Sequence, residues 1–197
     1  MKYLVLFSIL VIIAAALCGV IPTAADMNIY GGVVRLHVLA NSDGEGDQAV
    51  KLAVRDAVLG YVSCLVTSSG SADEAAETLS ENIGDIRAVV EKTLGDTGYD
   101  ASCSVSLSNE YYPEKKYDDV TFPSGNYTSL KIKLGEGAGH NWWCVLYPTI
   151  CTSGAKASDV MKQTGFSSDQ IRILTDGDTP TYKLKFKILE LFSGTSS

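Results

Sequence analysis

The chain has 197 residues, 46% of them hydrophobic, which suits one domain with a sizeable core and a targeting segment. Its net charge of −7 argues against nucleic-acid binding, because contacts to phosphates need clustered lysine and arginine. The basic residues are scattered along the chain, so no nucleic-acid partner is predicted.

The N-terminal segment has the composition of an export signal or a membrane anchor. Residues 4–17 are apolar almost without interruption, and residues 23–25 offer small side chains for cleavage. The uncharged stretch 4–21 also reaches the minimum length of a membrane span, so a membrane tether remains an alternative. We therefore expect an exported chain, with residues 1–25 as signal peptide or anchor and residues 26–197 as a single domain.

The first strand is predicted at residues 33–40, which are β-branched and apolar. Arg35 and His37 stand two positions apart in it, so their side chains are expected on one face of a sheet. Ser42 followed by Glu45 matches a capping box and predicts that a helix starts here.

Two helices follow the first strand. Apolar residues at helical spacing predict the first helix over residues 47–65. Ser71 and Glu74 form a second capping-box pattern, and the second helix is expected to run over residues 71–94. Gly95 is the expected stop, because glycine readily ends a helix in a left-handed conformation.

The second half of the chain carries strand patterns. Residues 101–108 and 127–134 alternate between apolar and polar side chains, and residues 142–147 predict a further strand. Residues 109–124 read as a long aromatic and charged connection, while residues 182–192 fit a strand or a helix. Together, the predicted helices and strands indicate an α+β fold with two helices packed on one face of a mostly antiparallel sheet.

Residues 135–151 are the most unusual run, because they hold both tryptophans, two cysteines and one of the two histidines. Three alternate glycines begin the run and allow positive φ angles or a close approach of the backbone. Adjacent side chains in a strand point to opposite faces. Only one of Trp142 and Trp143 can therefore face the core, and the other must face a second layer, a partner or water.

Export permits disulfides among the four cysteines beyond the N-terminal segment. We favour a bridge between Cys144 and Cys151, because a turn at residues 147–149 could bring them together. Pairing of Cys64 with Cys103 rests on the even count alone. The alternative is that all four are reduced core cysteines.

A cysteine–histidine nucleophile pair is the sharpest enzymatic hypothesis. Cys144 lies near His140 in sequence, but in an extended segment residues four apart are separated by about 13 Å. A disulfide to Cys151 would also remove the thiol. An exported thiol or cell-envelope hydrolase, and a cell-wall-binding domain, remain as alternatives to a protein that acts by binding another protein.

A metal site could be assembled from His37 and the acids Asp43, Glu45 and Asp47. The loop lacks the glutamate that a calcium-binding EF-hand needs at its twelfth position, where Leu52 stands. Acidic residues at the positive end of a helix dipole explain the cluster without a ligand. We therefore expect neither a metal nor a cofactor.

Three unusual motifs occur in a fixed order along the chain. They are Arg35-Leu36-His37-Val38-Leu39-Ala40-Asn41-Ser42-Asp43, then Phe122-Pro123-Ser124-Gly125 with Tyr127, and Gly135-Glu136-Gly137 with Gly139 and Asn141-Trp142-Trp143-Cys144-Val145. With them, residues 33–151 resemble the stage II sporulation protein R family.

The resemblance implies a non-enzymatic signalling protein of endospore formers. Such proteins are made in the forespore and exported into the space between the forespore and mother-cell membranes. There they are needed to activate a membrane-embedded aspartic protease, stage II sporulation protein GA, which processes pro-sigma-E in the mother cell. The resemblance supplies no catalytic residues. The residues that match the motifs are treated as candidates for partner contact or core packing: Arg35, His37, Asn41, Asp43, Gly135, Glu136, Gly137, Asn141, Trp142 and Trp143.

Overall fold

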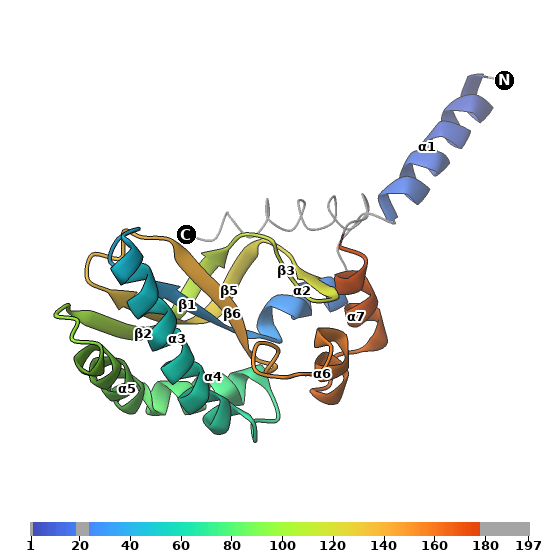
Figure 1. Cartoon of the computed structure of the whole chain (residues 1–197). Helices are drawn as coiled ribbons and strands as arrows, with labels where there is room; N and C mark the ends of the chain where they lie inside the picture. Colours follow the sequence, from blue (N-terminus) through green and yellow to red (C-terminus); the bar gives the residue numbers. More distant parts are fainter. Residues whose placement is uncertain (1, 19–23, 178–197) are drawn as a thin grey trace.

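A computed structural model describes residues 2–18 and 24–177 (Figure 1). Its helices are α1 (Lys2–Cys18), α2 (Ala24–Gly31), α3 (Glu45–Val66), α4 (Ala72–Glu81), α5 (Ile83–Asp96), α6 (Ala157–Gln163) and α7 (Ser168–Thr175). Its strands are β1 (Val34–Leu39), β2 (Cys103–Tyr112), β3 (Lys115–Tyr117), β4 (Val120–Phe122), β5 (Gly125–Leu134) and β6 (Asn141–Tyr147). Within the described ranges, no helix combines the length and apolar character that crossing a membrane requires. Residues 182–192 lie outside those ranges.

The sheet confirms the predicted α+β class. Four strands are ordered β2–β5–β1–β6, and a separate hairpin pairs β3 with β4. Strand β1 runs parallel to β5 and antiparallel to β6, and β2 runs antiparallel to β5. Strand β1 thus lies in the interior of a mixed, mostly antiparallel sheet, and its first five residues are buried.

Helices α3, α4 and α5 lie along one side of the sheet, which we call the first face (Figure 1). Their buried side chains recur at helical spacing, so each helix turns one apolar stripe toward the strands. The stripes pack on the alternate residues of β1 and β5 to form the larger core. Its members in the strands are Val34, Leu36, Val38, Leu130, Ile132, Leu134, Cys144, Leu146 and Tyr147.

The first face carries three helices instead of the two that were expected. The predicted helix over 71–94 breaks at Asn82, whose φ of −101° and ψ of 13° leave helical geometry. The Asn82 side chain donates to the carbonyl of Thr78 at 2.8 Å and so satisfies one of the last acceptors of α4. Helix α5 also passes the expected stop at Gly95 and turns at Gly98, which has a φ of +67°.

The two predicted capping boxes have different outcomes. Ser71 is the N-cap of α4, and its hydroxyl accepts from the backbone N–H of Glu74 at 3.1 Å. The prediction at Ser42 is wrong, because α3 begins after Gly44 without a side-chain cap. The Ser42 hydroxyl instead donates to the Asp47 carboxylate at 2.6 Å, where it helps to fold the preceding loop.

The opposite side of the sheet, the second face, has two halves. Helices α2, α6 and α7 and the β3–β4 hairpin cover the half around Arg35, which we call the covered half (Figure 1). The expected long connection over 109–124 is corrected here, because β2 continues to Tyr112 and the rest forms the hairpin. Asp119, in its turn, accepts from the Ser158 hydroxyl at 2.6 Å and thereby ties the hairpin to the start of α6.

The remaining part of the second face, the open half, is covered by no helix or hairpin among the described residues. Its side chains come from β2, β5, β1 and β6, whose register places them on one face. They are exposed or partly exposed: Leu39, Ser104, Ser106, Ser108, Lys131, Lys133, Asn141 and Trp143. His37 lies among them and is nearly buried.

The two tryptophans obey the alternation expected of a strand. Trp142 packs against the core of the first face, and Trp143 against the cluster of the second face. Both side chains remain partly exposed. The prediction that they face different surroundings is therefore confirmed.

Candidate functional site

Arg35 forms the centre of the covered half of the second face. Its side chain is fully buried. The Nε atom donates to the carbonyl of Cys144 at 3.1 Å, and Nη2 donates to the Tyr117 hydroxyl at 2.8 Å. Nη1 has no hydrogen-bond partner among the described residues. Arg35 forms no ion pair with a carboxylate of the described residues, so other groups around it must stabilise its charge.

Aromatic rings surround the Arg35 guanidinium. Its Cζ lies 4.3 Å from the centre of the Tyr112 ring and 4.9 Å from that of Tyr127. The rings of Tyr117 and Phe122 lie at 5.4 and 5.5 Å. Cations at such distances are attracted to ring faces, more strongly where water is excluded. Burial raises the pKa of Tyr112 and of Tyr117, so both hydroxyls stay neutral around the cation.

His37 lies on the same face as Arg35, as the sequence predicts, but at the border of the open half. Its Nδ1 lies 3.3 Å from Glu110 Oε2, and its Nε2 lies 3.0 Å from Asn141 Oδ1. Both ring nitrogens therefore have a side-chain partner. A histidine that acts as a base needs a free nitrogen near a nucleophile, so this arrangement suits a structural or binding role better than catalysis.

Glu110 connects the histidine to the rest of the face. Its carboxylate accepts from Lys131 Nζ at 2.6 Å and from the Ser129 hydroxyl at 2.9 Å. Burial raises the pKa of Glu110, but the hydrogen bonds from Lys131 and Ser129 and the charge of His37 outweigh burial, so the net pKa is lowered. The carboxylate is therefore ionised at neutral pH and holds three neighbours in place.

Each tryptophan of β6 carries a cation on its ring. Lys115 Nζ lies 4.8 Å from the centre of the Trp143 ring, which also lies 5.6 Å from the His37 ring. On the first face, Arg55 of α3 lies 5.1 Å from the Trp142 ring. Half-buried tryptophans beside cations are side chains of the kind that dominate protein interfaces.

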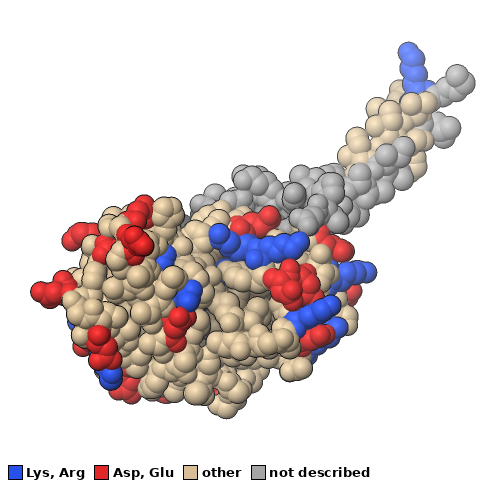
Figure 2. All heavy atoms as spheres, viewed as in Figure 1, with Lys and Arg blue, Asp and Glu red and all other residues tan. Residues whose placement is uncertain are grey.

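The loop after β1 and the loop after β5 interlock, and we call residues 40–47 and 135–140 the loop junction. Asn41 donates to Asp47 at 2.8 Å and accepts from the backbone N–H of Glu136 at 3.0 Å. The backbone N–H of Gly139 donates to the carbonyl of Ala40 at 3.0 Å. Acidic side chains gather at this end of the molecule, where α3 begins (Figure 2). Asn41 thus joins the two loops through its side chain.

The glycines of the third motif serve the same junction. Gly135 and Gly137 have φ angles of +53° and +65°, which favour glycine. A Cβ atom on Gly135 would lie 2.2 Å from Asn41 Oδ1, and one on Gly139 would lie 2.1 Å from the carbonyl oxygen of Ser42. The alternate glycines are therefore explained by close packing of two loops. Glu136, between them, is exposed.

Asp43 and His140 meet at the exposed rim of the loop junction. Asp43 Oδ1 accepts from the backbone N–H of His140 at 2.6 Å and lies 2.5 Å from its Nδ1. His140 is exposed, whereas Cys144 is buried and joined to Cys151 by a disulfide. The favoured bridge is therefore present, Cys64 and Cys103 are free, and the thiol required by the Cys144/His140 hydrolase alternative is bonded to another sulfur.

The residues of the metal hypothesis serve other contacts. Asp47 accepts from Ser42, Asn41 and the Tyr99 hydroxyl, and these hydrogen bonds lower the pKa of its carboxylate. His37 contacts Glu110 and Asn141 instead. Among the described residues no group of three potential ligands is gathered.

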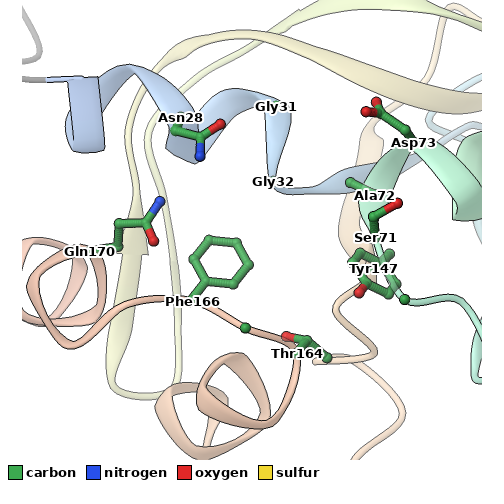
Figure 3. Close-up of a pocket in the computed structure, with 12 residues that line it drawn as sticks. Asn28, Gly31, Gly32, Ser71, Ala72, Asp73, Tyr147, Thr164, Phe166 and Gln170 are labelled. Atoms are coloured by element: carbon green, nitrogen blue, oxygen red, sulfur yellow. The ribbon is translucent and has the colours of Figure 1, made fainter.

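A cavity of about 210 Å³ lies between α2, the start of α4 and the segment that joins α6 to α7 (Figure 3). Phe166 points into it from that segment, with Asn28 and Gln170 close together on one side and Asp73 and Tyr147 on the other. Of the described residues that line it, Asp73 alone is charged. None of the described residues that line it belongs to the three motifs. Strand β6 reaches the cavity only at Tyr147, which follows the third motif.

Several site residues were not singled out from the sequence: Tyr112, Tyr117, Glu110, Ser129 and Lys131. Glu110 and Tyr112 continue the alternation of β2 beyond its expected end, and this is the signal that could have found them. Tyr117 has no such signal, because β3 has only three residues.

Comparison with known proteins gives one family. The family model for stage II sporulation protein R matches residues 31–157, which include the six strands of the described residues. A protein of Bacillus subtilis (strain 168) described as stage II sporulation protein R is 35% identical over 130 residues, covering 66% of this chain and 58% of that relative. The matched part is thus less than two thirds of the relative's length. No solved structure matches the chain significantly. From the family match and this relative, we conclude that the chain belongs to the stage II sporulation protein R family.

Proposed function

We propose that this protein is an exported signalling protein that binds and activates a membrane-embedded aspartic protease, stage II sporulation protein GA. Activation would lead to processing of pro-sigma-E in the mother cell during endospore formation. The family membership supports a role in sporulation. The resemblance described above supplies the protease as the partner, and the protein itself supplies no chemistry to the reaction.

The main support for this proposal is that some motif residues are used inside the fold while others lie at the surface. Arg35, Asn41 and the glycines are used inside the fold. Asn141 and Trp143 instead reach the surface together, beside His37, whose two nitrogens are already paired. This is a shaped surface that presents a tryptophan beside polar groups. Such a surface supports recognition of another protein more readily than catalysis.

We also propose that the protein works outside the cytoplasm, in the space between the forespore and mother-cell membranes. The apolar residues of α1 and the disulfide between Cys144 and Cys151 support export, because disulfides persist in oxidising compartments. Mass spectrometry of the exported protein, with and without thiol alkylation, tests both the bridge and cleavage of the N-terminal segment. A full-length, fully reduced protein in the cytoplasm would contradict this localisation.

The proposed activation is tested by changing Trp143 or Asn141 to alanine in sporulating cells. We expect processing of pro-sigma-E, followed by immunoblot, to fall at least several-fold while the protein remains exported and abundant. Asn126→Ala is the matched control, since Asn126 is an exposed asparagine on β5 outside the open half. Loss of the protein itself in the Trp143 variant would instead indicate a core role. Normal processing in both variants would contradict the proposal.

A further inference from the structure

The open half of the second face differs from an ordinary solvated sheet face in its strand arrangement. Its middle is the parallel pair of β1 and β5, in which His37 faces Lys131 and Leu39 faces Lys133. Parallel strands are normally buried on both faces. Here the first face of the pair is buried by helices, and on the second face Leu39, Lys131 and Lys133 remain partly exposed. The pair thus lacks, among the described residues, the cover that such strands usually have.

The charges of this surface are predominantly positive, although the chain as a whole has a net charge of −7. Lys131 and Lys133 project from β5, and Lys115 lies over the ring of Trp143 at their edge. The carboxylate of the open half itself, Glu110, is already engaged by Lys131, Ser129 and His37. Lys133 makes no ion pair with a described residue. A positive surface on an acidic protein is selective for negative charge.

The same surface holds a fixed apolar anchor. Trp143 is half-buried between the His37 and Tyr112 rings, at 5.6 and 6.0 Å between ring centres. His37 is held in turn by Glu110 and Asn141. The tryptophan ring is therefore already ordered before a partner arrives, which lowers the entropy lost on binding.

We propose that the open half of the second face is the surface that docks the partner, and that the docking segment of the partner is acidic and carries an apolar side chain. Its carboxylates would pair with Lys133 and Lys115, and its apolar side chain would pack on Trp143 and Leu39. This inference rests on the proposed function, and it names the surface and the chemistry that the protease would have to present. Glu136 is exposed in the loop after β5, next in the chain to Gly137, beside which the Lys133 side chain lies, and it is the nearby acid that would oppose such a segment.

The test measures binding of the exported protein to the protease in detergent micelles, at two salt concentrations. We expect Lys133→Glu to weaken binding at least tenfold, Lys133→Gln to weaken it less, and added salt to weaken binding of the unchanged protein. Lys92→Glu is the matched control, because Lys92 is an exposed lysine on α5, where it pairs with Asp96 far from β5 in sequence. Glu136→Gln should tighten binding. Circular dichroism verifies that each variant is folded.

The outcomes separate the two proposals. If the unchanged protein binds and Lys133→Glu binds equally well, the docking surface is wrong while the proposed function stands. Equal losses in Lys133→Glu and Lys92→Glu would likewise overturn it, because the effect would then be one of net charge. If the unchanged protein does not bind the protease, the proposed function and the docking surface fail together.

Discussion

Arg35 and His37 are two positions apart on one strand and face the same side of the sheet, but their surroundings differ. Arg35 is sealed under four aromatic rings and makes hydrogen bonds to a carbonyl and a hydroxyl. His37 contacts a carboxylate and borders exposed strands. The alternation of the strand decides only which face a side chain takes. Whether that face is a core or a surface depends on the hairpin and helices that cover one half of it.

The two halves of the second face differ in what their charged side chains hold in place. The covered half uses a cation to hold the β3–β4 hairpin on the sheet, since Tyr117 of β3 accepts from Arg35 and donates to the carbonyl of Trp143 at 3.2 Å. The open half uses a carboxylate to hold a tryptophan and a histidine at the surface. We therefore expect changes in the first half to affect stability, and changes in the second to affect recognition.

Replacing Arg35 with alanine is expected to have the largest effect. The change empties the space among the rings and leaves the carbonyl of Cys144 without its donor, so we expect a loss of about 3 kcal/mol in the free energy of unfolding. Urea unfolding measures it. His37→Ala is the comparison within the open half and is expected to cost about 1 kcal/mol, because it removes hydrogen bonds near the surface.

Arg35→Met separates the volume of the side chain from its charge. Replacing a buried ion by an apolar side chain of similar size is often close to neutral, so we expect Met to recover most of the loss. A methionine variant as unstable as the alanine variant would show that the hydrogen bonds of the guanidinium, and not its bulk, hold the hairpin. Equal losses for Arg35→Ala and His37→Ala would contradict the division between the halves.

The sequence predicted the elements that have a periodic pattern of apolar residues. It did not predict the cluster in which side chains from several strands meet around Arg35. Alternation of apolar and polar side chains predicts the strands at 127–134 and 142–147 and the opposed tryptophans. This pattern can be read within a single strand, because one face of the strand packs on the core. The burial of Arg35 could not be read in the same way, because arginine is ordinarily exposed and the four rings around it come from four other strands. The hairpin strands, each of three residues, are too short to show a period.

The loop junction closes the end of the sheet next to the open half, and Gly139→Ala is the next largest expected effect. The added Cβ would lie 2.1 Å from a backbone oxygen, so the two loops must separate. We expect a loss of about 3 kcal/mol, at the upper end of what overpacking costs. Gly154→Ala is the control, because a Cβ there meets nothing within 4 Å. Comparable unfolding midpoints for the two variants would contradict the close packing described here.

The disulfide tests whether the end of β6, beside the core of the first face, also depends on a covalent link. Cys144 and Cys151 are seven residues apart, and closing so short a loop is expected to contribute about 2.5 kcal/mol through the unfolded chain. The variant with both cysteines changed to alanine should therefore unfold at lower urea concentration than the oxidised protein. Adding a reductant should shift the unchanged protein in the same direction and leave the double variant unaffected. A shift of the double variant by reductant would mean that other cysteines are paired.

Glu110 gives the smallest expected effect and the one that is specific to the open half. Its pKa in the folded protein lies below its ordinary value of 4.5, since hydrogen bonds from Lys131 and Ser129 outweigh burial. A carboxyl whose pKa is lowered by folding contributes stability above the pKa of the unfolded chain and loses it as pH falls through the folded pKa.

Unfolding followed between pH 7 and pH 3 should thus show that the free energy of unfolding falls in acid. We expect this fall to be smaller in Glu110→Gln, by about 1 kcal/mol or less. If Glu110→Gln leaves this fall unchanged, the carboxylate does not hold the His37 and Lys131 side chains, and the surface proposed for docking would not be ordered in advance.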